Sequence, residues 1–188
     1  MSNKLYFKHL EGFTTTEGYW SGIDCVTLAK EVLDITKAKT MLEIGFNIGY
    51  SASTWLQEGI DNLYIIDINN HKHTLSALNA TKEHYKDKNI QWWLLDSKSK
   101  EAHDIVLPTI DIAFIDGEHS FAGITNDCNL ALNAGASWLV IDDYLHRGVN
   151  GIVEVIDDLV EKNVLQIVKK YPMTWIGQAE VVLCKVVK

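Results

Sequence analysis

The sequence predicts a doubly wound α/β protein with a mostly parallel, seven-stranded sheet and helices on both faces of that sheet. Two observations lead to this prediction. Strand and helix patterns alternate from residue 40 onward, and this order places parallel strands side by side with helices covering them. At the C-terminal end two strand patterns follow each other without a helical pattern between them, which predicts an antiparallel hairpin on the sheet edge.

The first 37 residues are expected to form an arm and a helix ahead of the sheet. Residues 1–21 show no clear periodicity and are rich in threonine, glycine and aromatic residues. We interpret them as an irregular arm that could act as a lid, with Tyr19 and Trp20 closing over a substrate. Residues 22–37 are a predicted helix, because Val26, Ala29, Leu33 and Thr36 lie on one helical face.

The core, residues 40–188, is read from apolar runs and helical spacings. Met41, Leu42 and Ile44 indicate a buried strand, and a helix is expected to start at Ser51 after a glycine turn. Later strands are expected at 63–68, 90–95, 110–115, 137–141, 164–168 and 180–187. Later helices are expected at 74–85, along the face of Phe121, Ile124, Cys128 and Ala131, and at 149–160. Residues 1–188 are expected to form a single domain.

Composition narrows the class of partner and the compartment. The net charge of −8 argues against a nucleic acid as the main partner, because neutralising phosphates requires clustered Lys and Arg. The chain shows neither a signal-peptide pattern nor an apolar run of about 20 residues that could span a bilayer. Its three cysteines are far apart and form no Cys-x-x-Cys pair, so neither zinc nor a disulfide framework is indicated. A reducing cytoplasm is therefore the expected location.

The most informative segment is the glycine turn at residues 45–49. A strand, a glycine turn and a helix start form a recurring nucleotide-binding device, since glycine admits the ligand to bare backbone. A dinucleotide loop has glycine at its middle position, whereas this loop has Asn47, whose side chain would crowd a diphosphate. S-adenosylmethionine (SAM) has no phosphate and carries a positive sulfonium, so this loop favours SAM over NAD.

An acid within the first strand supports a cationic ligand. Glu43 falls in an apolar strand, and a buried carboxylate needs a partner. Either a cationic ligand or the N–H groups of the loop itself could serve as that partner.

Four successive strands end in an acid, namely Asp67, Asp96, Asp116 and Asp142, with Asp143 beside the last. In an open parallel sheet the carboxyl ends of the strands line the ligand crevice. Asp67 lies about one strand–helix unit after the glycine loop, where a carboxylate can accept hydrogen bonds from both ribose hydroxyls. Asp96 and Ser97 are expected beside an adenine ring, although Asp is also a common turn and helix-capping residue.

The segment 114–121 holds the candidate catalytic residues. His119 lies three residues after Asp116 in a predicted loop and is the best candidate general base, because its intrinsic pKa is near neutral. The alternative is a histidine that only caps the following helix. Asp116, Asp142 and Asp143 together offer hard oxygen ligands that suit Mg²⁺ or another divalent cation. Without a metal, the three acids would repel one another and raise at least one pKa.

These motifs resemble those of the class I SAM-dependent methyltransferases, which have a Rossmann-like fold. Residues 42–51, 66–68 and 95–97 are similar to the family's glycine, ribose and adenine motifs. Residues 115–121 and 141–144 resemble motifs of methyltransferase family 24, a subgroup related to catechol O-methyltransferases. The resemblance covers residues 40 to about 187 and implies that SAM is contacted by Glu43, Gly45, Phe46, Asn47, Gly49, Ser51, Asp67, Ile68, Asp96, Ser97 and Asp116.

The resemblance also implies a reaction, O-methylation of a small-molecule hydroxyl. In the catechol-type enzymes a metal is held by acids at the places of Asp116 and Asp142, and by an Asn where this chain has Asp143, so metal use remains open. Three alternatives stay open as well: a SAM-binding module without turnover, another SAM-consuming enzyme on this fold, and an NAD-dependent oxidoreductase. Oligomeric state is also open, and six tryptophans would allow an aromatic interface between copies.

Overall fold

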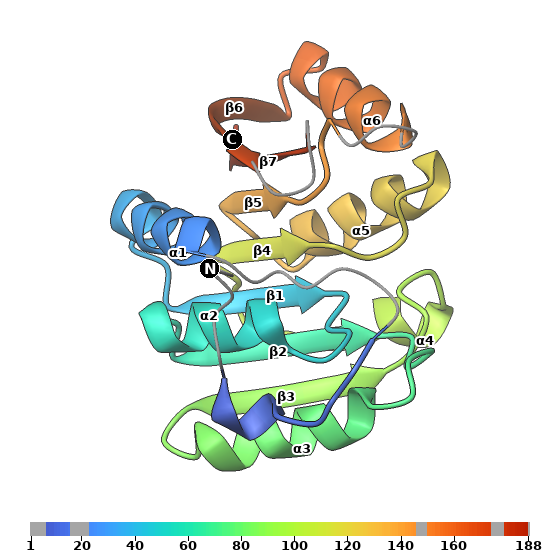
Figure 1. Ribbon diagram of the computed structural model, residues 1–188. Helices are drawn as coiled ribbons and strands as arrows, with labels where there is room; N and C mark the ends of the chain where they lie inside the picture. The colour runs from blue at the N-terminus through green and yellow to red at the C-terminus, as the bar shows by residue number, and fades with distance from the viewer. Residues whose placement is uncertain (1–6, 16–22, 146–149, 174–178, 188) are drawn as a thin grey trace.

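The computed structural model describes residues 7–15, 23–145, 150–173 and 179–187, and its centre is one sheet of seven strands. The strand order is β3-β2-β1-β4-β5-β7-β6 (Figure 1). The strands are β1 (Thr40–Ile44), β2 (Asn62–Asp67), β3 (Asn89–Leu94), β4 (Ile112–Ile115), β5 (Trp138–Ile141), β6 (Leu165–Met173) and β7 (Ala179–Val186). The predicted fold class is confirmed.

The order of the strands reverses beside β1, which pairs in parallel with both β2 and β4. Glu43 of β1 lies opposite Ile65 on one side and Phe114 on the other. This is the topological switch point, where open α/β sheets bind ligands outside the carboxyl ends of their strands. β7 runs antiparallel to both β5 and β6, which confirms the expected hairpin at the edge.

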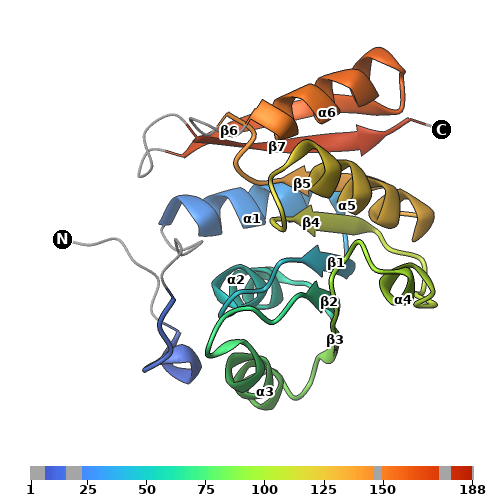
Figure 2. The same ribbon diagram turned by 90° about the vertical axis from the view of Figure 1, so that its right-hand side faces the viewer.

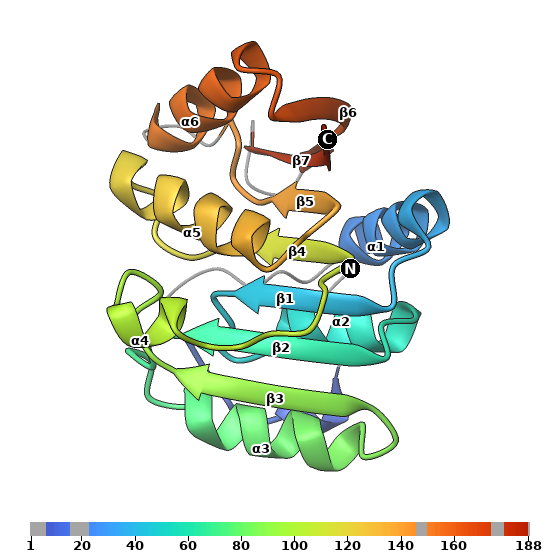
Figure 3. The same cartoon turned by 180° about the vertical axis from the view of Figure 1, so that it is seen from behind.

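Helices cover both faces of the sheet, as Figures 2 and 3 show from the side and from behind. One face carries α1 (Ile23–Thr36), α2 (Tyr50–Glu58), α3 (Thr74–His84) and a short 3-10 helix, η1 (Lys8–Leu10). The other face carries α4 (Lys100–His103), α5 (Phe121–Asn133) and α6 (Asn150–Glu161). Within the described ranges, none of these helices is long and apolar enough to cross a membrane.

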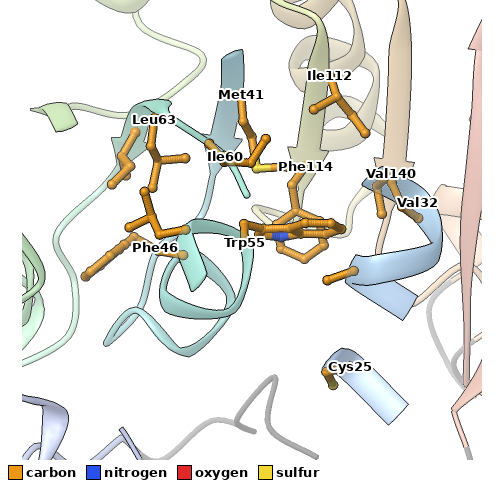
Figure 4. Packing of buried hydrophobic residues seen from close by; sticks show 14 of the residues in the cluster. Cys25, Val32, Met41, Phe46, Trp55, Ile60, Leu63, Ile112, Phe114 and Val140 are labelled. Atoms are coloured by element: carbon orange, nitrogen blue, oxygen red, sulfur yellow. The ribbon is translucent and has the colours of Figure 1, made fainter. Parts of the chain in front are cut away.

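The core on the α2 side centres on Trp55, which is fully buried and points from α2 toward β4 (Figure 4). Its ring centroid lies 5.7 Å from that of Phe114 in β4, at a tilted angle that aromatic pairs favour. Met41 of β1 and Val32 of α1 are also fully buried in this cluster. This packing holds α2 against β1 and β4, and so fixes the position of the glycine turn that precedes the helix.

The described part of the N-terminal arm is docked on α2 and α3. The ring of His9 stacks on that of His84 at 4.2 Å, and its Nε2 lies 3.0 Å from the hydroxyl of Ser53. The rings of Phe13 and His73 are 5.6 Å apart. The predicted lid residues Tyr19 and Trp20 lie outside the described residues.

Some details of the sequence interpretation were wrong. The buried face of α1 is formed by Cys25, Leu28, Ala29 and Val32, so it is rotated from the predicted face. Phe121 begins α5 but is 51% exposed, whereas the other three members of its predicted face are buried. β6 is longer than expected, and neither η1 nor α4 was predicted. Val149, the predicted start of the last helix, is outside the described residues.

Candidate functional site

The glycine turn brings the loops after β1 and β4 into direct contact. Gly45 has a φ of +92°, a region that favours glycine, and its N–H donates to the carbonyl of Ile66 at 2.9 Å. A Cβ at this position would lie 2.1 Å from the backbone oxygen of Asp116. Asp116 in turn donates its N–H to the carbonyl of Ile44 at 2.9 Å. The bare backbone of Gly45 is therefore needed for the two loops to meet.

The second glycine allows an aromatic side chain to support the turn from below. Gly49 has a φ of +84° at the start of α2, and a Cβ there would lie 2.4 Å from the ring of Phe46. The Phe46 side chain is 1% exposed and belongs to the core. Phe46 can therefore offer a ligand its backbone but not its ring.

Glu43 is fully buried beneath the turn, and only one of its two carboxylate oxygens has a hydrogen-bond partner among the described residues. Its Oε1 accepts a hydrogen bond from the Ser51 hydroxyl in the first turn of α2. Among the described residues its Oε2 has no hydrogen-bond partner. Burial raises the pKa of Glu43 to about 8, Ser51 counteracts that rise, and the nearby Asp116 and Asp67 add to it. A positive group placed beside Oε2 would stabilise the charged form.

Asp67 is the acceptor for two backbone N–H groups of the glycine turn. Its Oδ2 accepts the N–H of Phe46 at 2.7 Å and that of Asn47 at 3.1 Å, and its Oδ1 accepts the N–H of Asn69 at 2.6 Å. These two loop donors therefore do not serve Glu43. An ionised carboxylate has about four acceptor positions, so Asp67 retains about one. A grip on both ribose hydroxyls by separate lone pairs does not fit this arrangement.

Asn47 shows a second acceptor without a partner at the same turn. It adopts a φ of +54°, and its backbone carbonyl accepts the Thr74 hydroxyl at 2.9 Å. Its side-chain Oδ1 is buried and has no partner within the described part of the chain. The turn thus presents acceptors, Glu43 Oε2 and Asn47 Oδ1, where a dinucleotide loop would present donors.

The segments after β2 and β3 supply an apolar and a polar group at the same sheet edge. The side chain of Ile68 is 55% exposed directly after β2. Asp67 pairs with Leu94 in the parallel register, so Ile68 lies beside the segment that carries Asp96 and Ser97. Asp96 accepts the N–H of Lys98 at 2.9 Å and is partly exposed.

Ser97 contacts a residue that the sequence interpretation missed. Its hydroxyl donates to Oδ1 of Asp127 in α5 at 2.6 Å, and Asp127 is fully buried. Asp127 lies on the same helical stripe as Ile124, Cys128 and Ala131, which are buried too. An acid on a predicted apolar face is the signal that could have identified Asp127.

His119 lies between two of the predicted acids. Its Nε2 is 3.4 Å from Oδ1 of Asp116, and its Nδ1 is 3.7 Å from Oδ2 of Asp143. Asp143 adopts a φ of +53°, an uncommon conformation for a residue other than glycine. The backbone at His119 packs closely on α6, where a Cβ on Gly151 would lie 3.0 Å from the His119 carbonyl oxygen. The candidate base is therefore held between the ends of two strands, β4 and β5, and one helix, α6.

The acids at this edge behave as a group of like charges. Burial raises the pKa of Asp142 well above its usual range, and the charges of Asp116 and Asp143 add to the rise. This confirms the expectation that at least one of the three carries a raised pKa. No group of three or more His, Cys, Asp or Glu side chains in the described ranges is arranged to hold a metal ion. The side chains of Asp116, Asp142 and Asp143 therefore do not converge as a ready metal site among the described residues, and metal binding by them stays a prediction.

A comparison with protein families shows which family the chain belongs to. A family model described as a methyltransferase domain, that of methyltransferase family 24, matches residues 42–144. The match spans the glycine turn and all four acidic strand ends, Asp67, Asp96, Asp116 and Asp142. The protein belongs to this family of class I SAM-dependent methyltransferases, which confirms the resemblance seen in the motifs. No curated protein sequence matches the chain.

Solved structures share the fold at low sequence identity. A putative O-methyltransferase from Klebsiella pneumoniae has a TM-score of 0.69 at 16% identity, covering 98% of this chain and 92% of its own. The O-methyltransferase from Bacillus cereus, solved with SAH, has a TM-score of 0.65 at 17% identity, with 87% and 80% covered. The N-methyltransferase NodS from Bradyrhizobium japonicum has a TM-score of 0.62 at 15% identity, with 87% and 94% covered. The fold is thus shared by enzymes that methylate different atoms.

Proposed function

We propose that this protein binds SAM at the carboxyl edge of its sheet and transfers the methyl group to a hydroxyl of a small molecule. The observation that carries the proposal is the pair of buried acceptors at the glycine turn, Glu43 Oε2 and Asn47 Oδ1, which lack partners among the described residues. The ammonium group of SAM can donate hydrogen bonds to such acceptors, and its sulfonium adds positive charge beside them. A diphosphate does not, because it requires the loop N–H groups that Asp67 already binds.

In this proposal, different residues at the carboxyl edge of the sheet contact different parts of SAM. Glu43 and Asn47 accept from its ammonium group. Asp67 accepts one ribose hydroxyl with its remaining lone pair, and the exposed Ile68 packs on the adenine ring. Asp96 and Ser97 contact the edge of the adenine. Gly45, Gly49 and Ser51 shape the turn, and Asp116 closes the site from the next strand.

His119 is the proposed general base, and Asp116 and Asp143 orient it. SAM supplies an activated methyl group, so the protein mainly has to align the acceptor, and alignment alone can supply ~7–11 kcal/mol. His119 removes the proton of the acceptor hydroxyl, which contributes about 10²–10⁴-fold. The two flanking carboxylates hold the ring and stabilise its charged form. No step is assigned to a metal.

A small-molecule acceptor is proposed over a nucleic acid because of the net charge of −8. The three described cysteines are all free and buried, which supports a reducing, cytoplasmic location. We also propose that residues 1–37 act with the core 40–188 as one domain.

Calorimetric titration with S-adenosylhomocysteine, with and without Mg²⁺, tests the ligand site. We expect binding that does not depend on Mg²⁺ and that weakens at least tenfold in Asn47→Gly, which removes the Oδ1 acceptor and tolerates the φ of +54°, or in Gly45→Ala. Tight binding of NAD without binding of S-adenosylhomocysteine would contradict the proposal. Binding that requires Mg²⁺ would contradict the metal-free reading.

Product analysis tests the reaction itself. The protein is incubated with SAM and a panel of hydroxylated and aminated small molecules, and the adenosyl product is identified by mass spectrometry. S-adenosylhomocysteine with an O-methylated acceptor is expected, whereas methylthioadenosine would indicate another SAM-consuming reaction. His119→Asn should lower kcat about 10²–10⁴-fold and leave S-adenosylhomocysteine affinity unchanged. An unchanged kcat would remove His119 from the mechanism.

A further inference from the structure

A chain of hydrogen bonds behind the adenine segment ends on one oxygen of Asp127. The Ser97 hydroxyl donates to Asp127 Oδ1 at 2.6 Å, and the Asn126 amide nitrogen donates to the same oxygen at 3.1 Å. The other end of the Asn126 amide, its Oδ1, lies 2.9 Å from Nε2 of His103 in α4. The chain thus joins α4, α5 and the loop after β3.

The direction of these bonds is determined by the groups themselves. Asn126 places its oxygen toward the His103 ring nitrogen and its NH₂ toward Asp127, so Asp127 Oδ1 accepts from Asn126. The Ser97 hydroxyl donates its proton to the same oxygen. With its only proton committed, the Ser97 hydroxyl can offer nothing but lone pairs to a ligand.

Asp127 has little freedom to leave this position. It is fully buried in α5, and a Cβ on Gly117 would lie 2.7 Å from its Oδ2. That oxygen has no hydrogen-bond partner in the described ranges, so the carboxyl is held by packing on one side and by Ser97 and Asn126 on the other. At the surface, an ion pair between Lys98 and Glu118 joins the loop after β3 to the loop after β4.

We propose that Asp127 is a positioning residue that sets nucleobase specificity by fixing the Ser97 hydroxyl as an acceptor. The inference rests on the proposed function, which places adenine beside Ser97. The exocyclic amino group of adenine is a donor and pairs with a fixed acceptor. A 6-oxopurine presents a carbonyl there instead, and two acceptors facing each other leave both without a partner. Sites of this kind reject the mismatched ligand strongly.

The test compares two ligands that differ only at this group, S-adenosylhomocysteine and its deaminated analogue S-inosylhomocysteine. Calorimetry gives the ratio of the two dissociation constants for the wild type and for Asp127→Ala. We expect the wild type to prefer the adenosyl ligand at least tenfold. Asp127→Ala removes the acceptor of the Ser97 proton, which can then turn toward a carbonyl, so the ratio should fall to about threefold or less.

Two further variants separate this role from a structural one. Ser97→Ala should also lose the preference, and it decides the matter if Asp127→Ala does not fold. Asp104→Asn is the control, because it neutralises an exposed acid at the end of α4 that belongs neither to this hydrogen-bond chain nor to the proposed ligand site, and it should keep the wild-type ratio. An unchanged ratio in Asp127→Ala or Ser97→Ala would overturn the inference, as would loss of the preference in Asp104→Asn. A wild type that binds neither ligand would instead refute the proposed function.

Discussion

Gly45→Ala should be far more damaging than Gly12→Ala or Gly135→Ala, although all three glycines have a left-handed backbone. Gly45 (φ +92°), Gly12 (φ +87°) and Gly135 (φ +80°) share the same backbone region. Gly12 has nothing within 4 Å of an added Cβ, and Gly135 meets only a methyl group of Thr109 at 3.8 Å. These two glycines therefore isolate the cost of the backbone conformation, which is about 1–2 kcal/mol for alanine.

At Gly45 a steric cost is added to that backbone cost. The added Cβ would lie 2.1 Å from the Asp116 carbonyl oxygen, well inside the 3.4 Å at which ordinary contact begins. The loop after β4 must move away, which strains the bond from the Asp116 N–H to the Ile44 carbonyl. Overpacking costs about 1–3 kcal/mol and a buried unpaired donor about 1–3 kcal/mol. The loop either stays overpacked or gives up that bond, so these two costs are alternatives, and together with the backbone cost Gly45→Ala should lose about 2–5 kcal/mol of unfolding free energy.

Urea unfolding of the three variants, followed by circular dichroism, measures this difference. Folded proteins of this size have about 5–15 kcal/mol to lose, so Gly45→Ala should still fold with a much lower midpoint. Equal losses in Gly45→Ala, Gly12→Ala and Gly135→Ala, within about 0.5 kcal/mol, would refute the reasoning. That result would mean that the loops after β1 and β4 do not meet as closely as described.

Two pH effects on stability follow from buried titratable groups. The pKa of Glu43 is raised from 4.5 to about 8, so its contribution to stability is complete below pH 4.5 and is lost as the pH rises through about 8. Urea unfolding at pH 6 and pH 8.5 should show this loss, on the order of a few kcal/mol, in the wild type and not in Glu43→Gln. The pKa of His9 is lowered from 6.5 to about 4, by burial and then by His84, so its contribution is present above pH 6.5 and is lost as the pH falls through about 4. Because His9 is only half-buried, its protonation should lower the free energy of unfolding by only about 1 kcal/mol. His9→Asn should therefore flatten the dependence of stability on pH between pH 6.5 and 4. A wild-type slope in that variant would contradict this assignment.

The order of strands and helices was largely predictable because each strand is a short apolar run and most βα crossovers leave a helical pattern. The exception is α4 between β3 and β4, whose four residues are too few to show one. Periodicity was less reliable for the orientation of helices. α1 has apolar residues on more than one side, so the choice between the Cys25–Ala29–Val32 face and its neighbour depends on which side meets the sheet. Phe121 fits the apolar face of α5 but stands in its first turn, beyond the edge of the sheet.

The candidate site was predicted by position but not by hydrogen bonding. The sequence places Asp67 beside the glycine loop, yet spacing alone cannot show that its carboxylate accepts N–H groups of Phe46 and Asn47. The link from Ser97 to Asp127 joins residues 30 positions apart and depends on the packing of α5 against the sheet. Local patterns thus identify which residues reach the edge, whereas their partners are determined by tertiary contacts.

The distribution of donors and acceptors at the turn is what separates this site from a dinucleotide site of similar shape. In a dinucleotide loop the free N–H groups face a diphosphate, and the ribose acid is left for the sugar. Here Asp67 draws the N–H groups of Phe46 and Asn47 to itself, so the turn loses its attraction for anions. The oxygens that remain, Glu43 Oε2 and Asn47 Oδ1, attract a positive donor. Asp67 therefore contributes to the choice of ligand by the N–H groups that it occupies, in addition to any contact it makes with a ribose.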